Sequence, residues 1–390
     1  MNRTRELHEQ RCLNAALKLH QYMVRAHWGP QGLMGPDPGI RINYRIGRFV
    51  KSYLRAVPWR DALYYLQAQG YWVLANWDLQ QETGDATYRD LAVLASDHIL
   101  HRQREDGAWD YPNPEWKGRV ATVEGVWGSL GLLESYRRTH AEKYLLGALR
   151  WYEFLEGTVG YQQVGDQLAV NYFAHAAGAR VPNNATDALR FLGELAEVTG
   201  QRTYLERCPG MVTFLNHVQL PSGEIPYTVD GAEHGVGRTH FQCFQYNAFQ
   251  CLGLMEYCGL TGDERALPVI RKLLDFLTHG VDADGHAWYA CGQGRRRVTY
   301  HAAALGAAFQ RAGQMGIGGY GEIAERAFGY VLAQQRPDGS VPYSAHDYGV
   351  FRDNRSYPRY LAMIMKHLLS AALPGQDRRV LEPETVDRVS

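Results

Sequence analysis

A short turn pattern that recurs about every 60 residues constrains the fold of this 390-residue chain more than any other feature. Each copy places a glycine after a polar or acidic residue, and an aromatic residue follows a few positions later. The marker glycines of this turn are Gly107, Gly223, Gly285 and Gly339, with weaker copies at Gly165 and Gly32. Internal repeats of this kind predict an array of similar supersecondary units rather than several unrelated domains.

A second turn, Thr-Gly-Asp or a close variant, alternates with the first. It occurs at residues 83–85 and 261–263, and a related sequence occupies 199–201. The interval to the next marker glycine is the same in all three cases and leaves room for one helix of about five turns. The segment 88–104 contains no proline or glycine and repeats apolar residues at helical spacing. Each unit is therefore predicted to be helix, short turn, helix and longer loop.

We predict an all-α fold, an (α/α)6 toroid or barrel of six helical hairpins, in which each hairpin packs on its neighbours. An open solenoid is the alternative, but the end repeats show no especially polar outer face. The segments after the long loops, such as 239–259 and 299–313, are rich in small and apolar residues, as expected of inner helices. We expect residues 1–372 to form a single toroid domain and residues 373–390 a polar C-terminal tail.

Composition and charge narrow the possible partners and the environment. The 41 lysines and arginines balance 41 acidic residues, so no net charge favours nucleic acid or an anionic membrane. No segment approaches the roughly 18 consecutive apolar residues of a membrane span, and the polar N-terminus lacks the apolar core of a signal peptide. The six cysteines form no CxxC pair and are interpreted as reduced, buried thiols. These features predict a cytoplasmic protein with no cofactor and no metal.

The long loops on the Asp-Gly side are expected to line one cavity, because function usually lies on long loops of a rigid scaffold. Arginine offers a planar fork that matches carboxylate, phosphate or sulfate, and tyrosine and tryptophan can stack on a sugar ring. The sequence therefore predicts that a saccharide with negative charge binds there. The candidate binding residues are Arg45, Trp109, Tyr111, Arg119, Asn183, Asn184, Tyr246, Asn247, Trp288, Arg352 and Arg355.

Two histidines are candidates for acid–base chemistry. His240 and His301 begin consecutive predicted inner helices, each beside an aromatic residue, which for His301 is Tyr300. A histidine near a tyrosine can remove and return a proton α to a carboxylate. The alternative interpretation is that each histidine only packs or caps at a helix start.

Two acids, Glu124 and Asp187, form a separate catalytic candidate. They occupy similar places on two successive predicted inner helices. Two carboxyl groups across a cleft are what glycoside hydrolysis requires. The alternative is that they are first-turn acids favoured by the helix dipole.

The repeat architecture and the Arg-, Tyr- and His-rich end of residues 40–372 resemble the α/α-barrel carbohydrate-active enzymes. These include polysaccharide lyases, unsaturated-uronyl hydrolases and the C-terminal domain of glucuronyl C5-epimerases. Residues 353–360 resemble the Arg- and Tyr-bearing last helix of the epimerases, which implies a catalytic role for Tyr357. The resemblance implies a lyase or C5-epimerase that abstracts a proton from a uronate-containing saccharide or polysaccharide.

Three other functions stay open. The first is a glycoside hydrolase that uses Glu124 and Asp187, and the second is a non-catalytic glycan-binding protein. The third is an isoprenoid cyclase or a prenyltransferase-like toroid, although the chain lacks DxDD and DDxxD motifs. Tyr300-His301 resembles part of the prenyltransferase zinc site and residues 288–292 part of the lanthionine cyclase site, but neither pattern is complete.

Overall fold

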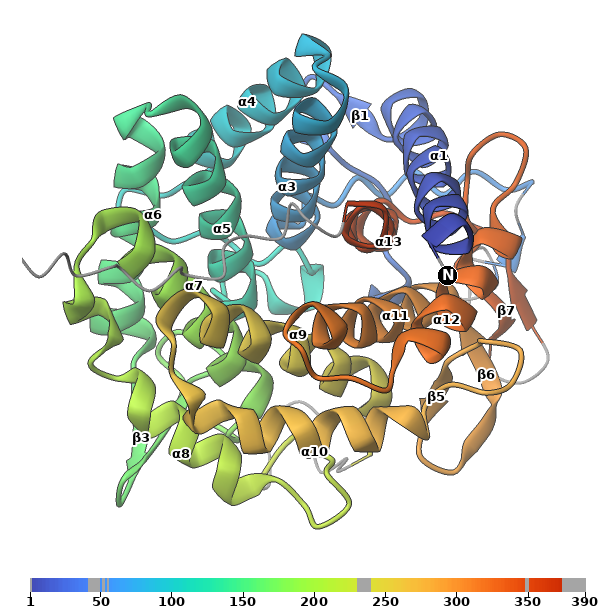
Figure 1. Ribbon diagram of the computed structural model, residues 1–390. Helices are drawn as coiled ribbons and strands as arrows, with labels where there is room; N and C mark the ends of the chain where they lie inside the picture. The colour runs from blue at the N-terminus through green and yellow to red at the C-terminus, as the bar shows by residue number, and fades with distance from the viewer. Residues whose placement is uncertain are drawn as a thin grey trace, which may run out of the picture.

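The computed structural model describes residues 2–40, 50, 53–54, 56–229, 240–347 and 351–373. Within these residues, helices surround a central axis (Figure 1). The α-helices are α1 (Asn2–Ala26), α3 (Leu66–Thr83), α4 (Ala86–His101), α5 (Thr122–Thr139), α6 (Glu142–Phe154), α7 (Pro182–Thr199), α8 (Cys208–Val218), α9 (Cys243–Thr261), α10 (Leu267–Thr278), α11 (Thr299–Gln314), α12 (Gly321–Gln334) and α13 (Pro358–Ala372).

The helices form two concentric rings, which confirms the predicted (α/α)6 toroid. The inner helices α3, α5, α7, α9, α11 and α13 pack on one another in that order, and α13 contacts α3 to close the ring. Each of α4, α6, α8, α10 and α12 packs outside the inner helix that precedes it. Helix α1 packs on α13, so the two ends of the chain together form the sixth hairpin. As predicted, the helix after each long loop is an inner one.

The repeated glycine turn follows the outer helix at four of the connections between hairpins, after α4, α8, α10 and α12. The four marker glycines all have positive φ, and a Cβ at any of them would collide with a backbone carbonyl of a neighbouring outer helix. In three copies a glutamine strengthens the joint, because its Nε2 donates both to the glycine carbonyl and to a carbonyl of the next outer helix. These glutamines are Gln103, Gln219 and Gln335, and their outer-helix acceptors are Gly147, Val269 and Ala15.

The two weaker copies of this turn are different structures. Gly165 lies in the hairpin turn between β3 (Tyr161–Val164) and β4 (Gln167–Val170), with open space around it. Gly32 belongs to the short hairpin of β1 (Trp28–Gly29) and β2 (Gly32–Leu33). Their interpretation as helix-joining turns was therefore wrong, since a glycine with positive φ serves equally well in a β-hairpin.

The Thr-Gly-Asp turns end inner helices in the left-handed conformation. Gly84, Gly200 and Gly262 have φ of 72°, 70° and 70° and have no atom close to where a Cβ would lie. The preceding threonine accepts a hydrogen bond from the backbone N–H two residues later, at 3.2 Å from Thr83 to Asp85. These tight turns leave the opposite end of the toroid to carry the long loops.

The long loops contain strands that the sequence pattern did not predict. Strands β5 (Trp288–Ala290), β6 (Gln293–Val298), β7 (Ser344–Asp347) and β8 (Phe351–Asp353) form an antiparallel sheet in the order β5-β6-β7-β8. The sheet therefore joins the loop after α10 to the loop after α12. Short 3-10 and π segments add to the loops at Pro38–Ile40, Pro114–Trp116, Leu155–Val159, Arg202–Leu205 and Glu264–Ala266.

The apolar core fills the space between the two rings. Large, fully buried side chains come from inner helices, as Phe191 does, and from outer helices, as Trp151 and Phe214 do. The remaining faces of the inner helices look toward the axis of the toroid. No helix in the described part of the chain combines the length and apolarity needed to cross a membrane.

Candidate functional site

A cavity of about 550 Å³ runs along the axis of the toroid. Its wall at the loop end is aromatic, and its wall at the other end is charged. The aromatic wall includes Tyr65, Tyr111, Trp116, Tyr172, Tyr227, Tyr246, Tyr300 and Tyr360. The charged wall includes Asp78, Glu134, Arg138, Glu194, Glu256, Arg311 and Lys366. The aromatic wall gives the loop end the flat surfaces on which a sugar ring can stack.

Glu124 lies on the first turn of α5 and is 1% exposed. Its carboxylate accepts hydrogen bonds from the backbone N–H groups of Leu66 and Gln67 at the start of α3, with Oε2 3.3 Å from the Gln67 nitrogen. Burial raises the pKa of Glu124 to about 7, against the opposing effect of Arg359 and these N–H groups. The carboxyl group therefore titrates near neutral pH.

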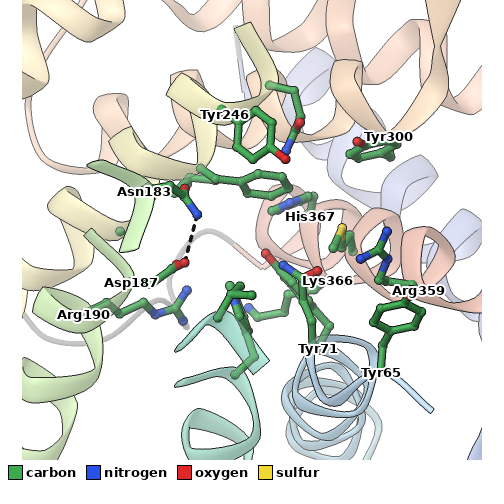
Figure 2. Close-up of a pocket in the computed structure, with 18 of the residues that line it drawn as sticks. Tyr65, Tyr71, Asn183, Asp187, Arg190, Tyr246, Tyr300, Arg359, Lys366 and His367 are labelled. Carbon is green, nitrogen blue, oxygen red and sulfur yellow. Dashed lines mark hydrogen bonds between the residues drawn. The ribbon is translucent and has the colours of Figure 1, made fainter. Parts of the chain in front are cut away.

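Asp187 lies on the first turns of α7, the next inner helix, and also lines the cavity. Its Oδ2 accepts a hydrogen bond of 3.0 Å from the Asn183 amide (Figure 2). Burial raises the pKa of Asp187 to about 7, although Arg190 and Asn183 favour the charged form. Two carboxyl groups from successive helices thus face one cavity, and both titrate in the range that acid–base catalysis requires.

Arg190 extends from α7 toward the same space as Asp187 (Figure 2). Its guanidinium carbon lies 5.1 Å from the centre of the Trp127 ring. Its Nε is buried and has no hydrogen-bond partner among the described residues. A buried donor of this kind is costly unless a ligand or water satisfies it, so Arg190 is suited to bind an anionic group.

His367 enters the cavity from α13, close to Tyr71 (Figure 2). Its ring centre is 5.9 Å from that of Tyr71, and its Nε2 has no hydrogen-bond partner in the described part of the chain. Burial lowers the pKa of His367 to about 3, so the imidazole is neutral at physiological pH. A neutral, buried imidazole can accept a hydrogen bond from a ligand.

Arg359 approaches the cavity from the first turn of α13. Its Nε is 2.8 Å from Asp37 Oδ2, and its guanidinium lies over the rings of Tyr65 at 4.3 Å and Tyr360 at 4.8 Å. Asp37 is 1% exposed. This buried ion pair ties the loop before α3 to the last helix and holds a cation at the aromatic wall.

The tyrosines of the wall are neutral donors at physiological pH. Burial raises the pKa of Tyr65, Tyr111, Tyr172, Tyr246 and Tyr300 well above the ordinary value. The Tyr300 hydroxyl donates to Gln242 Oε1 at 3.3 Å. A phenol in this state binds ligand oxygen atoms more readily than it removes a proton from carbon.

The structure brings seven of the residues predicted for the site to this cavity. They are Tyr111, Glu124, Asn183, Asn184, Asp187, Tyr246 and Tyr300. Arg45 lies outside the described residues. The seven come from the first turns of inner helices and from one long loop, as the toroid geometry predicts.

Three of the candidate catalytic residues lie away from the cavity wall. His301 is 0% exposed and stacks on Tyr289 with ring centres 5.5 Å apart. Tyr357 donates to Asp353 Oδ2 at 2.7 Å, and His240 Nδ1 is 2.8 Å from Glu224 Oε2. Neighbouring positions of a helix point in different directions, so Tyr300 faces the axis while His301 does not.

The other predicted binding residues also have partners away from the cavity. Their contacts are with backbone groups or with rings of nearby loops and strands, and Arg352 is exposed in β8. Trp109 donates to Ile99 O, Asn247 bonds the backbone of Ile225, Arg355 donates to the carbonyls of Leu54 and Val57, Arg119 lies over Phe173, and Trp288 contacts His286. The aromatic and arginine content of a loop therefore does not by itself identify cavity residues.

The prediction did not include Asp37, Tyr71, Arg190, Arg359 and His367, which all line the cavity. The sequence does contain one indication for Arg190, because this residue follows Asp187 by three positions and so shares its helix face. Asp37 and Arg359 meet only because the ring closes. In the described residues, the side chains with metal-ligand geometry, Glu224, His240 and Cys291, are not part of the cavity wall.

The ring of hairpins and its axial cavity define the structural class, an (α/α)6 toroid, and solved structures of that class resemble this one closely. A possible member of the GH105 family from Salmonella enterica serovar Paratyphi A has a TM-score of 0.70 at 12% identity, with 94% of each chain covered. The unsaturated glucuronyl hydrolase of Bacillus sp. GL1, responsible for the degradation of glycosaminoglycan, has a TM-score of 0.67 at 13% identity, with 94% of this chain and 96% of that chain covered.

Other structural relatives carry different chemistry on the same fold. Cellobiose 2-epimerase from Bacillus thermoamylovorans has a TM-score of 0.64 at 14% identity and covers 78% of this chain and 87% of its own. No protein-family model and no curated protein sequence matches the chain. At these identities the likeness establishes the fold and confirms the predicted architectural resemblance, while function depends on the site.

Proposed function

We propose that the protein is a glycoside hydrolase that acts on an anionic, uronate-containing saccharide. One observation carries the proposal: Glu124 and Asp187 are buried carboxyl groups that face one cavity, each with a pKa raised to about 7. Glycoside hydrolysis needs one carboxyl group in the acid form and a second as carboxylate. Groups that titrate near neutral pH can share these roles at physiological pH.

The surroundings of the two groups suggest how the roles divide. Backbone N–H groups of α3 stabilise the Glu124 carboxylate, whereas Asp187 accepts a hydrogen bond from one neutral amide. Asp187 would donate its proton to the glycosidic oxygen as the bond to the anomeric carbon breaks. Water would add to that carbon and lose a proton to Glu124, and a proton transfer through solvent would restore the starting state.

The cationic and aromatic groups of the cavity support an anionic sugar as substrate. Arg190 has a buried, unsatisfied Nε beside Asp187, and its planar fork suits a sugar carboxylate. The tyrosines and Trp116 offer stacking faces at the loop end. The similar unsaturated glucuronyl hydrolase acts in glycosaminoglycan degradation, so saccharides with a terminal unsaturated uronate are the first substrates to test.

Proton abstraction from a sugar carbon, as in a lyase or an epimerase, is a second candidate. His240, His301 and Tyr357, expected for that role, lie away from the cavity. His367 is the histidine that lines the cavity in their place, but its pKa, lowered to about 3 by burial, makes it a weak base. The charged groups of the cavity give an isoprenoid cyclase no comparable support.

One absorbance assay separates these functions, because an unsaturated uronate conjugated to its carboxylate absorbs in the ultraviolet. Hydrolysis of an unsaturated uronyl disaccharide releases a sugar that opens and loses this absorbance. Elimination from a saturated polyuronate creates the absorbance, and epimerisation leaves it unchanged but incorporates deuterium from heavy water. We expect a decrease with the unsaturated disaccharide. Binding without any product would instead support a glycan-binding protein and overturn the proposal.

A further inference from the structure

A second group of reactive side chains gathers outside the cavity wall, around the start of α9. Glu224, His240 and Cys291 each place one ligand atom within 4.8 Å of the others. Cys243 places a second thiol behind this group, with its sulfur 3.0 Å from that of Cys291 but outside the set of three mutually close ligand atoms. The four residues come from three separate parts of the chain: the loop after α8, the start of α9 and the residue after β5.

The chemistry of this group calls for a cation. The Glu224 side chain is 2% exposed, and within the described residues its ion-pair partner is His240, with no lysine or arginine beside it. The Glu224 oxygen that faces His240, Oε2, is also 3.9 Å from Cys291 Sγ. A buried carboxylate beside two thiols is unfavourable when all three are ionised, unless a positive charge joins them.

The backbone is arranged to support a thiolate and to fix the carboxylate. The Cys291 N–H donates to Cys243 Sγ at 3.0 Å, and such a bond favours the charged sulfur. Asn247 accepts from the N–H of Ile225 at 2.7 Å and donates to its carbonyl at 3.0 Å, which holds the residue next to Glu224. Outer contacts of this kind orient the ligands of metal sites.

We infer that Glu224, His240 and Cys291 form a zinc site that anchors the segment before α9 beside the cavity. A thiolate, an imidazole and a carboxylate suit Zn²⁺, which binds such ligands at about 2.0–2.3 Å and completes its tetrahedron with a fourth ligand such as water. Ligand atoms around such an ion lie about 3–4 Å apart. The separations from Glu224 Oε2, 2.8 Å to His240 Nδ1 and 3.9 Å to Cys291 Sγ, are close to that spacing.

The position of the site gives the ion a structural role next to the saccharide cavity. Phe241 and Gln242 directly follow the ligand His240, and both line the cavity. Gln242 has a left-handed backbone with φ of 45°, which is unfavourable for a residue with a side chain. A metal bond to His240, two residues earlier, would help to hold that conformation, and with it the acceptor of the Tyr300 hydroxyl.

Metal analysis of the purified full-length protein, followed by reconstitution, tests the inference. The reduced, metal-free protein is titrated with Zn²⁺ or Co²⁺ while Tm and the absorbance of a cobalt–thiolate bond are recorded. We expect saturation at one equivalent, a rise in Tm, and a cobalt–thiolate band. Glu224→Gln and Cys291→Ser should each weaken metal affinity by more than about tenfold, since even loss of an outer contact costs that much.

Cys251→Ser is the matched control, because Cys251 is a buried thiol on the same helix about two turns further along. It should bind metal as the unmodified protein does. Alkylation of the denatured, unreduced protein and mass analysis then count free thiols. A Cys243–Cys291 disulfide without metal uptake after reduction would overturn the inference, as would metal binding that Cys291→Ser leaves unchanged. Neither result would bear on saccharide hydrolysis, which depends on other residues.

Discussion

Helices α5 and α7 each carry one acid at the loop end of the cavity and one at the other end, and the acids at the two ends differ in their charged partners. At the loop end, Glu124 and Asp187 are buried, and burial raises the pKa of each to about 7. At the other end, Arg137 reaches both Glu134, at 3.3 Å, and Glu194, and Arg138 is 2.8 Å from Glu134. The same two helices thus hold one pair of acids in direct ion pairs and a second pair without them.

The difference shows how a toroid can place catalytic groups at one end of its cavity and stabilising ion pairs at the other. A guanidinium in direct contact keeps a carboxylate charged and joins neighbouring helices. A buried carboxyl group held by weaker donors is driven toward its neutral form and can transfer a proton near pH 7. We therefore expect substitutions at the loop end to change turnover, and substitutions at the other end to change the free energy of unfolding.

Asp187→Asn should produce the largest effect. The amide has the size of the carboxyl group but cannot donate the proton, so kcat should fall by about 10²–10⁴-fold, the usual contribution of a general acid. KM should change little, and Tm should rise rather than fall at neutral pH, because burial disfavours the charged carboxylate that the amide replaces. Steady-state kinetics on the unsaturated uronyl disaccharide, with circular dichroism as the check on folding, would measure this.

Glu194→Gln, seven residues further along α7, is the matched control at the other end of the cavity. It should keep turnover and lose stability. If Asp187→Asn retained full kcat while Glu194→Gln abolished it, the functional roles of the two ends would be reversed.

Arg137→Ala should give the largest loss of stability. Removal of this arginine leaves Glu134 and Glu194, which are 2% and 5% exposed, without their shared cation. Breaking a buried ion pair in this way costs about 3–5 kcal/mol of the free energy of unfolding. Urea denaturation would measure the loss, and kcat of the folded protein should be unchanged.

Arg89→Ala serves as the comparison for an exposed pair. Arg89 and Asp90 are 54% and 68% exposed, so this change should cost no more than about 1 kcal/mol. Equal losses in the two variants would show that the Arg137 network contributes no more than a surface contact.

The sequence predicted the ring but only part of the cavity, because some cavity contacts join residues that are far apart in the chain. The marker glycines are required locally, since a Cβ at Gly107 or Gly285 would collide with a neighbouring helix backbone, so their pattern is visible in one dimension. Glu124 and Asp187 were also found, because helix starts after long loops place them at one end. The Asp37–Arg359 pair joins residues at opposite ends of the chain, and no local pattern records such a contact.

The dependence of stability on pH should differ between the two ends. In the unfolded chain the Asp187 carboxyl ionises near its ordinary pKa of 3.8, whereas in the folded protein it keeps its proton up to about 7. The folded state therefore binds more protons over this range, and the free energy of unfolding falls as pH rises from about 4 to about 7. Asp187→Asn removes this titration, so the variant should gain stability relative to the unmodified protein, by at most about 4 kcal/mol above pH 7.

Asp85→Asn is the control, because the Asp85 carboxyl should change the free energy of unfolding with pH in the opposite direction. The backbone N–H of Thr87 lowers the pKa of this exposed helix-capping carboxyl, so its contribution is present above the ordinary pKa and is lost as pH falls. Denaturant titrations should show the Asp187 trend between about pH 4 and pH 7, and the opposite Asp85 trend below about pH 4, where the unfolded chain takes up its proton first. A flat difference between Asp187→Asn and the unmodified protein would mean that the folded-state pKa of Asp187 is not raised.

Arg190→Lys should give the smallest effect among the cavity variants and show what the loop end recognises. Lysine keeps the positive charge but not the planar fork, and its ammonium cannot pair with a carboxylate through two parallel bonds. We expect KM for the uronate substrate to rise by about tenfold, equivalent to about 1.4 kcal/mol, with kcat nearly unchanged. A neutral analogue in which the carboxylate is reduced to an alcohol should bind both proteins equally. If the analogue loses as much affinity as the uronate, Arg190 supports the Trp127 wall rather than the substrate charge, and the anionic specificity must come from another cation of the cavity, such as Arg359 at the aromatic wall.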